Sequence, residues 1–166
     1  MGKRSDFKRI EKDYYPTIDI RAWQALKPHL PEHFTYAEPC YGKGHLARMI
    51  EGDMVYASDL EGDGVDALTL IDCDMPTADY IITNPPWSRH ILHPMIDHFR
   101  MLRPTWLLFD ADWAHTKQSS EYMKYCRKIV SVGRLIWIEG TKTSGKDNCA
   151  WYLFDKNKCK TEFIGR

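Results

Sequence analysis

The residues with the clearest potential for chemistry are Asn84, Pro85, Pro86 and Trp87, which follow the apolar run 80–82. Two successive prolines end a strand, because they lack the backbone N–H that a sheet ladder needs. The side-chain oxygen of Asn84 and the carbonyl oxygen of Pro85 can each accept a hydrogen bond. Two acceptors aimed at one planar NH₂ group would make its nitrogen nucleophilic, and a base could stack on Trp87. A strand-ending turn with a buried tryptophan is the alternative that this tetrapeptide leaves open.

A second candidate site is the segment Glu38-Pro39-Cys40-Tyr41-Gly42-Lys43-Gly44, which directly follows the strand expected over 34–37. Gly42 and Gly44 allow positive φ and let a ligand approach the backbone closely. A helix is expected over 46–50, so that backbone N–H groups at its start could face a ligand. The full glycine fingerprint of dinucleotide-binding proteins is absent, and a tight turn would also explain the pattern.

The elements that must position these residues alternate between strands and helices. The link 61–64 is too short for a normal crossover helix, so the third strand is expected to be irregular or its crossover abbreviated. Helices are expected from Asp19 to Pro28 and around the apolar stripe 91–99. Strands are expected over 34–37, 54–58, 65–70, 80–83, 105–109, 129–138 and 149–154, the last two joined by a long hairpin loop.

Polar residues also follow two other strands. Asp59 ends the second strand, where a carboxylate can hold the two hydroxyls of a ribose. Trp113 and His115 follow the fifth strand and could face a ligand, although a surface loop with a half-buried tryptophan is equally consistent with the sequence. The spacing of the histidines at 90, 93 and 98 matches no metal template, so no metal site is predicted. Ser119 or Ser120 is expected to cap a helix whose inner face includes residues 122, 123 and 126.

Bulk composition sets the class of protein. A chain of 166 residues suits one domain, expected over 14–166 behind a polar N-terminal extension over 1–13. The net charge of zero gives no global electrostatic argument for nucleic acid, but it permits a local basic face. Five scattered cysteines without a C-x-x-C pair indicate a reducing compartment, and therefore a cytoplasmic protein. No apolar run approaches the roughly 20 residues of a membrane span.

The two motifs together resemble the S-adenosylmethionine-dependent amino-methyltransferases, the group that contains the DNA N6-adenine methyltransferases. Glu-Pro-x-x-Gly-x-Gly begins at Glu38 and Asn-Pro-Pro-Trp begins at Asn84, and the resemblance extends from about Tyr14 to Phe154. It implies a Rossmann-like class I methyltransferase fold of the α/β class. Such a fold has a seven-stranded, mostly parallel sheet, helices on both faces and an antiparallel final strand. The compact build is similar to that of adenine methyltransferases from phages and prophages.

The resemblance also implies a role for each candidate residue. Glu38 would hold the methionine part of S-adenosylmethionine, Asp59 its ribose, and Asp66 its adenine amino group, with Asp72 as the alternative to Asp66. Asn84 and Pro85 would polarise the target amino group, and Trp87 would stack on the target base. The other residues of the implied site are Tyr15, Pro16 and Thr17, which would close over the cofactor, and Pro39, Cys40, Gly42, Gly44, Leu60, Ala67 and Pro86. Asn84 would also border the cofactor.

The implied reaction is methyl transfer to the N6 amino group of adenine in DNA, without a metal. RNA adenine and the side-chain amide of protein glutamine remain alternatives, because enzymes that methylate them also have Asn-Pro-Pro-aromatic sites. Cytosine N4 is disfavoured, since those enzymes usually have serine in place of Asn84. No segment is large enough to be a separate target-recognition region. Sequence choice would come from the loops 88–90, 110–117 and 139–148 or from a homodimer partner, and a non-catalytic cofactor-binding subunit is a further alternative.

Overall fold

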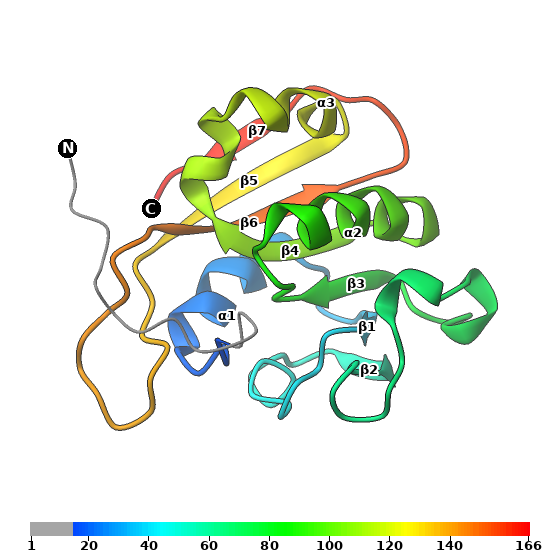
Figure 1. The fold of residues 1–166 in the computed structure, drawn as a ribbon, viewed down its shortest axis with the longest axis horizontal. Helices are drawn as coiled ribbons and strands as arrows, with labels where there is room; N and C mark the ends of the chain where they lie inside the picture. The colour runs from blue at the N-terminus through cyan, green and yellow to red at the C-terminus, as the bar shows by residue number, and fades with distance from the viewer. Residues whose placement is uncertain (1–14) are drawn as a thin grey trace.

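The structure, a computed structural model, describes residues 15–166, so the expected extension over 1–13 lies outside the described residues. The described chain forms one seven-stranded sheet with the order β2-β1-β3-β4-β6-β5-β7, from the bottom of Figure 1 to its top. All strand pairs are parallel except those of β6 with β4 and β5. The strands are β1 (Thr35–Glu38), β2 (Asp53–Ala57), β3 (Tyr80–Thr83), β4 (Thr105–Asp110), β5 (Cys126–Gly133), β6 (Cys149–Phe154) and β7 (Glu162–Ile164).

The α-helices of the described chain lie on both faces of this sheet. They are α1 (Ile20–Leu26), α2 (Arg89–Leu102) and the short α3 (Ser120–Met123). Successive residues of a strand point to opposite faces, so Ile81 belongs to the core that contains α2, whereas Ile82 belongs to the core that contains α1. Both isoleucines are fully buried. The expected mostly parallel sheet with helices on both faces is therefore confirmed.

Short 3₁₀ helices occupy several connections between the larger elements. They are η1 (Lys27–His29), η2 (Ala67–Thr69), η3 (Asp72–Asp74), η4 (Ala111–His115) and η5 (Lys117–Ser119). Asp19 begins α1 as its N-cap, since its side chain accepts from Arg21 N, and η1 with Pro28 follows the end of the helix. The helix predicted from Asp19 is confirmed. Pro94 lies inside α2 without ending it, and the predicted apolar stripe of this helix is buried against the sheet.

The helix expected after the glycines is absent, because residues 42–49 form turns and a bend. Gly42 and Gly44 both have positive φ, of 54° and 71°, which turns the chain away from helical geometry twice within three residues. Only the bonds from Arg48 N to Gly44 O, at 3.1 Å, and from Ile50 N to Leu46 O, at 3.3 Å, have helical spacing. The segment is too short to add further turns before β2 begins at residue 53.

The expected third strand over 65–70 is also absent. The side chain of Asp66 accepts from Leu68 N and caps η2, which removes these backbone groups from a sheet ladder. The seventh strand is instead β7, which pairs with β5 at the opposite edge. The three residues of β7 carry only a weak strand pattern, so this strand was not predicted.

Two smaller expectations about the C-terminal part are wrong. Ser119 precedes α3, but its hydroxyl donates to Ala114 O and Thr116 O and makes no cap bond. Cys126 begins β5, so it does not lie on the inner face of the preceding helix. The sixth strand accordingly starts earlier than expected and ends at Gly133, where φ is 87°. The strand over 149–154 is confirmed as β6.

Candidate functional site

A cavity of about 1100 Å³ opens at the carboxyl ends of β1, β2 and β3. The chain passes from β1 to β2 on one side and then returns to β3 on the other side of β1, which makes this edge a topological switch point. Ligands of open α/β sheets bind at such points. This volume slightly exceeds the roughly 300–1000 Å³ typical of small-molecule pockets, so the cavity can hold more than one ligand group.

Most of the predicted site residues meet in this cavity. Lining residues predicted from the sequence are Tyr15, Pro16, Thr17, Glu38, Pro39, Cys40, Gly42, Asp59, Leu60, Asp66, Ala67, Asn84, Pro85, Pro86 and Trp87. Gly44 is not among the lining residues. A Cβ at Gly44 would lie 2.3 Å from the hydroxyl oxygen of Tyr41, so this glycine serves the close packing of the turn.

The side chain of Asn84 is held by hydrogen bonds at both ends. Its Nδ2 donates to the carbonyl oxygen of Tyr15 and to Thr17 Oγ1, each at 3.0 Å. Its Oδ1 accepts from Trp87 Nε1, also at 3.0 Å. The opposite orientation of the amide would place two donors against each other, so the network fixes which atom is the oxygen. Oδ1 keeps a second lone pair, and donation by Nδ2 raises the electron density on that oxygen.

The first prediction concerns the anchor that Thr17 supplies to Asn84. Thr17 is buried, and its hydroxyl oxygen accepts from Asn84 Nδ2. Valine has nearly the same size as threonine but carries no hydroxyl, so one Nδ2 proton loses its acceptor. We expect Thr17→Val to lower the free energy of unfolding by about 1–3 kcal/mol, because a part-buried donor loses its partner. Urea unfolding measures this change. The exposed Thr143→Val is the matched control, and equal unfolding free energies for the two variants would contradict the network.

Trp87 is half-buried between the sheet and the β5–β6 loop, residues 134–148. Its indole N–H is committed to Asn84, which fixes the in-plane direction of the ring. Its ring meets that of Trp137 edge to face, with centroids 5.6 Å apart and planes at 84°. Trp87 is therefore a fixed aromatic wall of the cavity.

Glu38 lies at the inner end of the cavity, where β1 ends. It is buried, and its Oε2 has no hydrogen-bond partner among the described residues. Burial raises the pKa of the carboxyl to about 9, and the nearby Asp59 carboxylate contributes to the rise. A buried acid without a partner is costly. The cavity thus presents an acceptor that a bound cation or hydrogen-bond donor can satisfy.

Asp59 organises the turns that form the wall of the cavity next to β2. Its Oδ2 accepts from Gly42 N at 2.8 Å and its Oδ1 accepts from Glu61 N at 3.0 Å. These bonds tie the glycine turn after β1 to the turn after β2. Each carboxylate oxygen retains a further acceptor site, and Asp59 lines the cavity.

Asp66 and Asp72, the two alternatives for contact with the cofactor adenine, differ in position. Asp66 is a lining residue, and so are Ala67 and Leu60, a leucine that remains 64% exposed beside the cavity. Asp72 lies outside and forms an ion pair with Arg103. Asp66 is therefore the carboxylate of this segment that can reach a ligand.

Trp113 and His115 do not line the cavity. Trp113 is buried within an aromatic cluster on the α2 side of the sheet, where its Nε1 donates to His93 Nε2 at 3.0 Å. Burial lowers the pKa of His93, which favours the neutral ring that this bond requires. His115 is exposed at the end of η4, and His98 bonds Leu70 O at 2.9 Å. Within residues 15–166, no group of three or more potential ligand side chains could hold a metal.

Several lining residues were not predicted. They are His45, Leu46, Glu61, Gly62, Val65, Leu68, Ile91 and Met95, whereas Tyr41 and Lys43 belong to the predicted glycine segment and Ser88 and His90 to a predicted recognition loop. Most flank a predicted residue in the chain, so a wider window around each motif would have included them. His45 stands out because its buried Nδ1 has no partner among the described residues, a property that sequence does not reveal.

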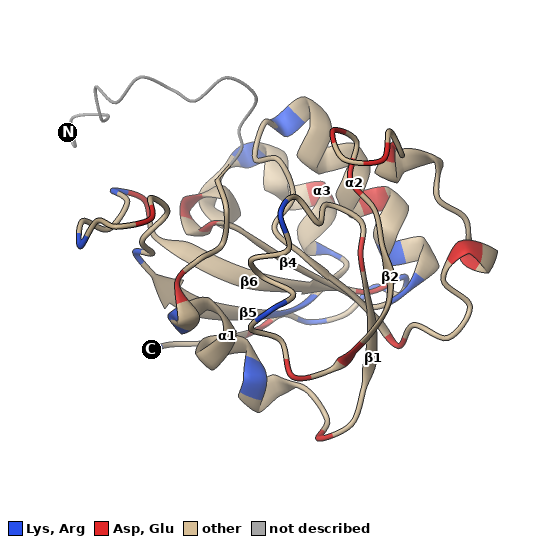
Figure 2. Cartoon of the chain, turned by 90° about the horizontal axis from the view of Figure 1, so that it is seen from below, with Lys and Arg blue, Asp and Glu red and all other residues tan. Residues whose placement is uncertain are grey.

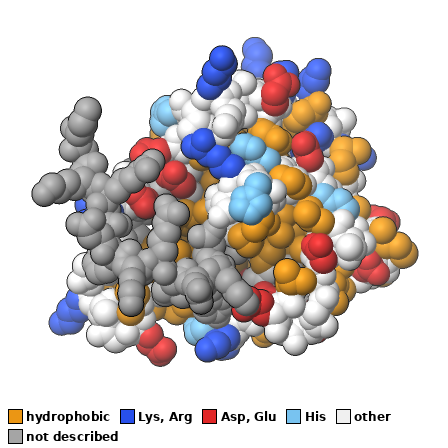
Figure 3. All heavy atoms as spheres, viewed as in Figure 1, with side chains coloured by type: hydrophobic (Ala, Val, Ile, Leu, Met, Phe, Trp, Pro, Cys, Tyr) orange, Lys and Arg blue, Asp and Glu red, His pale blue; other side chains and the backbone are white. Residues whose placement is uncertain are grey.

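Charges of both signs are mixed over the described chain, and acidic residues recur on the loops near β1 and β2 (Figure 2). The space-filling view shows hydrophobic side chains gathered near the middle of one face, with histidine side chains beside them (Figure 3). No helix in the described part of the chain is long and apolar enough to cross a membrane.

Comparison with known protein families found no match, and neither did comparison with curated proteins. Among solved structures, a Pyrococcus horikoshii protein provisionally assigned as an RNA methyltransferase is 17% identical, with a TM-score of 0.54 over 93% of each chain. A Listeria monocytogenes protein provisionally assigned as a class I S-adenosylmethionine-dependent methyltransferase is 9% identical, with a TM-score of 0.56 over 96% of this chain and 67% of that one. The chain therefore has the Rossmann-like class I methyltransferase fold, as expected.

Proposed function

We propose that the chain is an S-adenosylmethionine-dependent methyltransferase that modifies the N6 amino group of adenine in nucleic acid, with DNA as the first candidate substrate. The observation that carries this proposal is the orientation of Asn84. Both Nδ2 protons are bonded to the segment 15–17, so Oδ1, which accepts from Trp87 Nε1, is the amide atom that remains for a ligand, and Pro85 lines the same cavity.

The residues of the cavity fit this cofactor. The unpartnered Oε2 of Glu38 suits the ammonium of its methionine part, and Asp59 has acceptor sites for ribose hydroxyls. Asp66 can accept from the adenine amino group, and the exposed Leu60 can cover the face of that adenine. Asp59, Glu61 and Asp66 also line the cavity, and together with Glu38, whose carboxyl would ionise on binding, they favour a ligand that carries a sulfonium and an ammonium.

S-adenosylmethionine supplies an activated methyl group on its sulfonium. The chain's own contribution is to orient the nucleophile. Asn84 Oδ1 and the Pro85 carbonyl would each accept a hydrogen bond from the target NH₂ group. These two bonds would draw the nitrogen lone pair out of conjugation with the ring. Trp87 would hold the base by stacking, which typically contributes about 1–3 kcal/mol. The amino group loses a proton only after it has become cationic, so no general base is needed before attack.

The nucleic acid itself is the less constrained part of the proposal. In duplex DNA the base must leave the stack, which costs a few kcal/mol. RNA adenine is the second candidate, and the Pyrococcus horikoshii neighbour provisionally assigned as an RNA methyltransferase supports testing it. Protein glutamine is disfavoured, because a broad tryptophan wall matches a flat base better than it matches an aliphatic amide side chain.

The experiment uses the full chain with tritiated S-adenosylmethionine and, in parallel, unmethylated DNA, total RNA and protein. Nucleoside mass spectrometry then identifies the product. N6-methyladenine in DNA is the expected result, and N6-methyladenine only in RNA moves the substrate to the second candidate. Cofactor binding without methyl transfer to any polymer contradicts the proposal that the chain is an enzyme and favours a cofactor-binding subunit. Absence of cofactor binding overturns the proposal entirely.

A further inference from the structure

The β5–β6 loop is joined to the candidate site through Trp137. The Trp137 ring lies against Trp87, as described above, and also meets the Tyr15 ring edge to face, with centroids 6.3 Å apart and planes at 65°. Both neighbours belong to the Asn84 network, since Tyr15 accepts from Asn84 Nδ2 and Trp87 donates to Asn84 Oδ1. Trp137 is not a lining residue of the cavity, so it can act on a ligand only through these neighbours.

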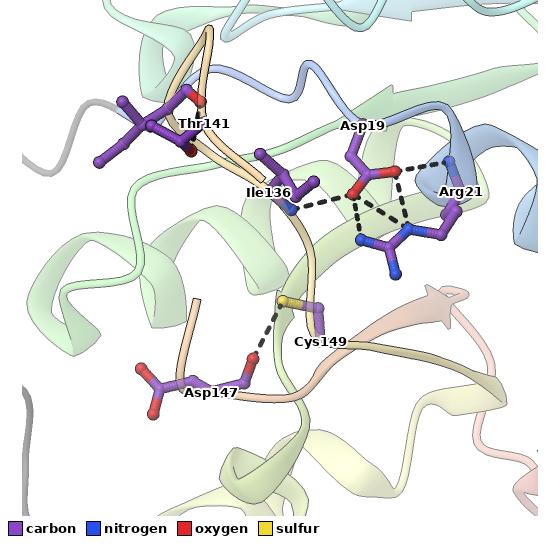
Figure 4. A network of polar contacts seen from close by, with 7 residues as sticks. Asp19, Arg21, Ile136, Thr141, Asp147 and Cys149 are labelled. Carbon is purple, nitrogen blue, oxygen red and sulfur yellow. Dashed lines mark hydrogen bonds and ion pairs between the residues drawn. The ribbon is translucent and has the colours of Figure 1, made fainter. Parts of the chain in front are cut away.

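The base of the loop is fixed to α1 beside Trp137. Ile136 N donates to Asp19 Oδ2 at 2.9 Å, and the same carboxylate caps α1 and pairs with Arg21 (Figure 4). Partial burial alone would raise the pKa of Asp19, but the bonds from Arg21 and from Ile136 N outweigh it and lower the pKa. The carboxylate is therefore charged at neutral pH, and it anchors the residue immediately before Trp137.

A second contact limits how Trp137 can move. Gly145 N donates to Leu135 O at 2.7 Å, which closes the base of the loop. A Cβ at Gly145 would lie 2.9 Å from Trp137 Nε1, so the indole lies directly on the backbone of this glycine. The tip behaves differently: Ile138 is 53% exposed and residues 139–143 are exposed. The base of the loop is built to hold one ring, while its tip remains accessible.

We propose that Trp137 is a positioning residue that holds the Trp87 ring in the orientation required for its bond to Asn84. This inference rests on the proposed function. Without the perpendicular ring behind it, Trp87 can rotate and withdraw its N–H from Asn84 Oδ1. The face offered to the target base and the direction of the Asn84 lone pair would then change together.

The test compares Trp137→Ala and Trp137→Phe with the wild-type full chain in methyl transfer to the DNA or RNA found to be the substrate. We expect kcat of Trp137→Ala to fall about tenfold, while the cofactor Kd from titration calorimetry changes less than about twofold. Trp137→Phe keeps an aromatic edge and should recover most of the loss. Ile138→Ala, which removes the exposed neighbour in the same loop, is the matched control and should retain the wild-type kcat.

Circular dichroism supplies a readout that does not depend on turnover. The Trp87–Trp137 pair is close enough for exciton coupling, so Trp137→Phe and Trp87→Phe should remove the same spectral couplet. A wild-type kcat in Trp137→Ala, or a couplet that survives in both phenylalanine variants, overturns the inference alone. A kcat loss in Trp137→Ala that Trp137→Phe fails to recover also overturns it. Absence of methyl transfer by the wild-type chain overturns the proposed function and, with it, the inference.

Discussion

An Asn84→Ala variant is expected to transfer methyl groups about 100- to 1000-fold more slowly than the wild-type chain, the usual effect of removing one oriented acceptor or donor at the reacting centre. Asn84 Oδ1 is the acceptor placed beside Trp87, and alanine offers none. The two donors that hold Tyr15 and Thr17 are lost at the same time, so the segment 15–17 loses its anchor. Single-turnover assays at saturating cofactor measure the rate of the chemical step.

Two further variants separate these effects. Asn84→Asp keeps an acceptor oxygen beside Trp87 but places a second oxygen against the Tyr15 carbonyl, which repels it. We expect this variant to be impaired chiefly in cofactor binding, through the segment 15–17. Asn157→Ala changes an exposed asparagine after β6 and should retain wild-type turnover. An unchanged methylation rate in Asn84→Ala would contradict the assignment of Asn84 as the residue that orients the target amino group.

The second large effect is expected for Glu38→Gln. Glutamine has nearly the same shape but cannot form an ion pair with an ammonium group. We expect the affinity for S-adenosylmethionine to fall about 10- to 100-fold, because a hydrogen bond to a charged group is lost. In the wild-type chain the carboxyl must lose its proton when the ammonium binds, since its pKa without ligand is about 9. Calorimetry at pH 7 in two buffers of different ionisation enthalpy should therefore detect proton release on binding by the wild-type chain and none by Glu38→Gln.

The same carboxyl makes stability depend on pH. Its pKa rises from an ordinary 4.5 to about 9 on folding, so between these values the folded chain holds a proton that the unfolded chain has lost. The stabilising contribution of this proton is full below pH 4.5 and is lost as pH rises through this window to about 9. In thermal unfolding without ligand, the unfolding temperature of Glu38→Gln should rise relative to that of the wild-type chain as pH increases from 6 to 9. The exposed residue Glu32 supplies the control, since the unfolding temperature of Glu32→Gln should change with pH as that of the wild-type chain does. The same pH dependence in all three chains would contradict the raised pKa of the buried Glu38 carboxyl.

Much of the site could be predicted because its residues are coded locally. A pair of prolines ends β3, so Asn84 and Trp87 must lie at the carboxyl edge of the sheet, and Asp59 must follow β2 for the same reason. The strand β6 was recognisable from six successive apolar residues, 149–154. These signals need no knowledge of what packs nearby.

The remainder depends on contacts between distant segments. Trp137 is fifty residues from Trp87 in the chain, and nothing in its local sequence identifies that neighbour. The helix predicted over 46–50 fails because two residues with positive φ precede a stretch too short for further turns. The strand predicted over 65–70 fails because the side chain of Asp66 competes for a backbone N–H. The periodicity of apolar residues reveals neither the positive φ of the glycines nor the side-chain bond of Asp66.

The edge strand β2, at the bottom of Figure 1, has no outer neighbour in the described chain, because the segment that could pair with it forms turns and 3₁₀ helices. Met54 and Val55 remain exposed there. Sparse apolar burial and an open row of backbone groups place this edge at the low end of local stability. A ligand bridging Glu38, Asp59 and Asp66 would add contacts to this open edge of the sheet and stabilise it. Binding and local opening of β2 would then be coupled, on the opposite side of the cavity from the amide that directs the chemistry.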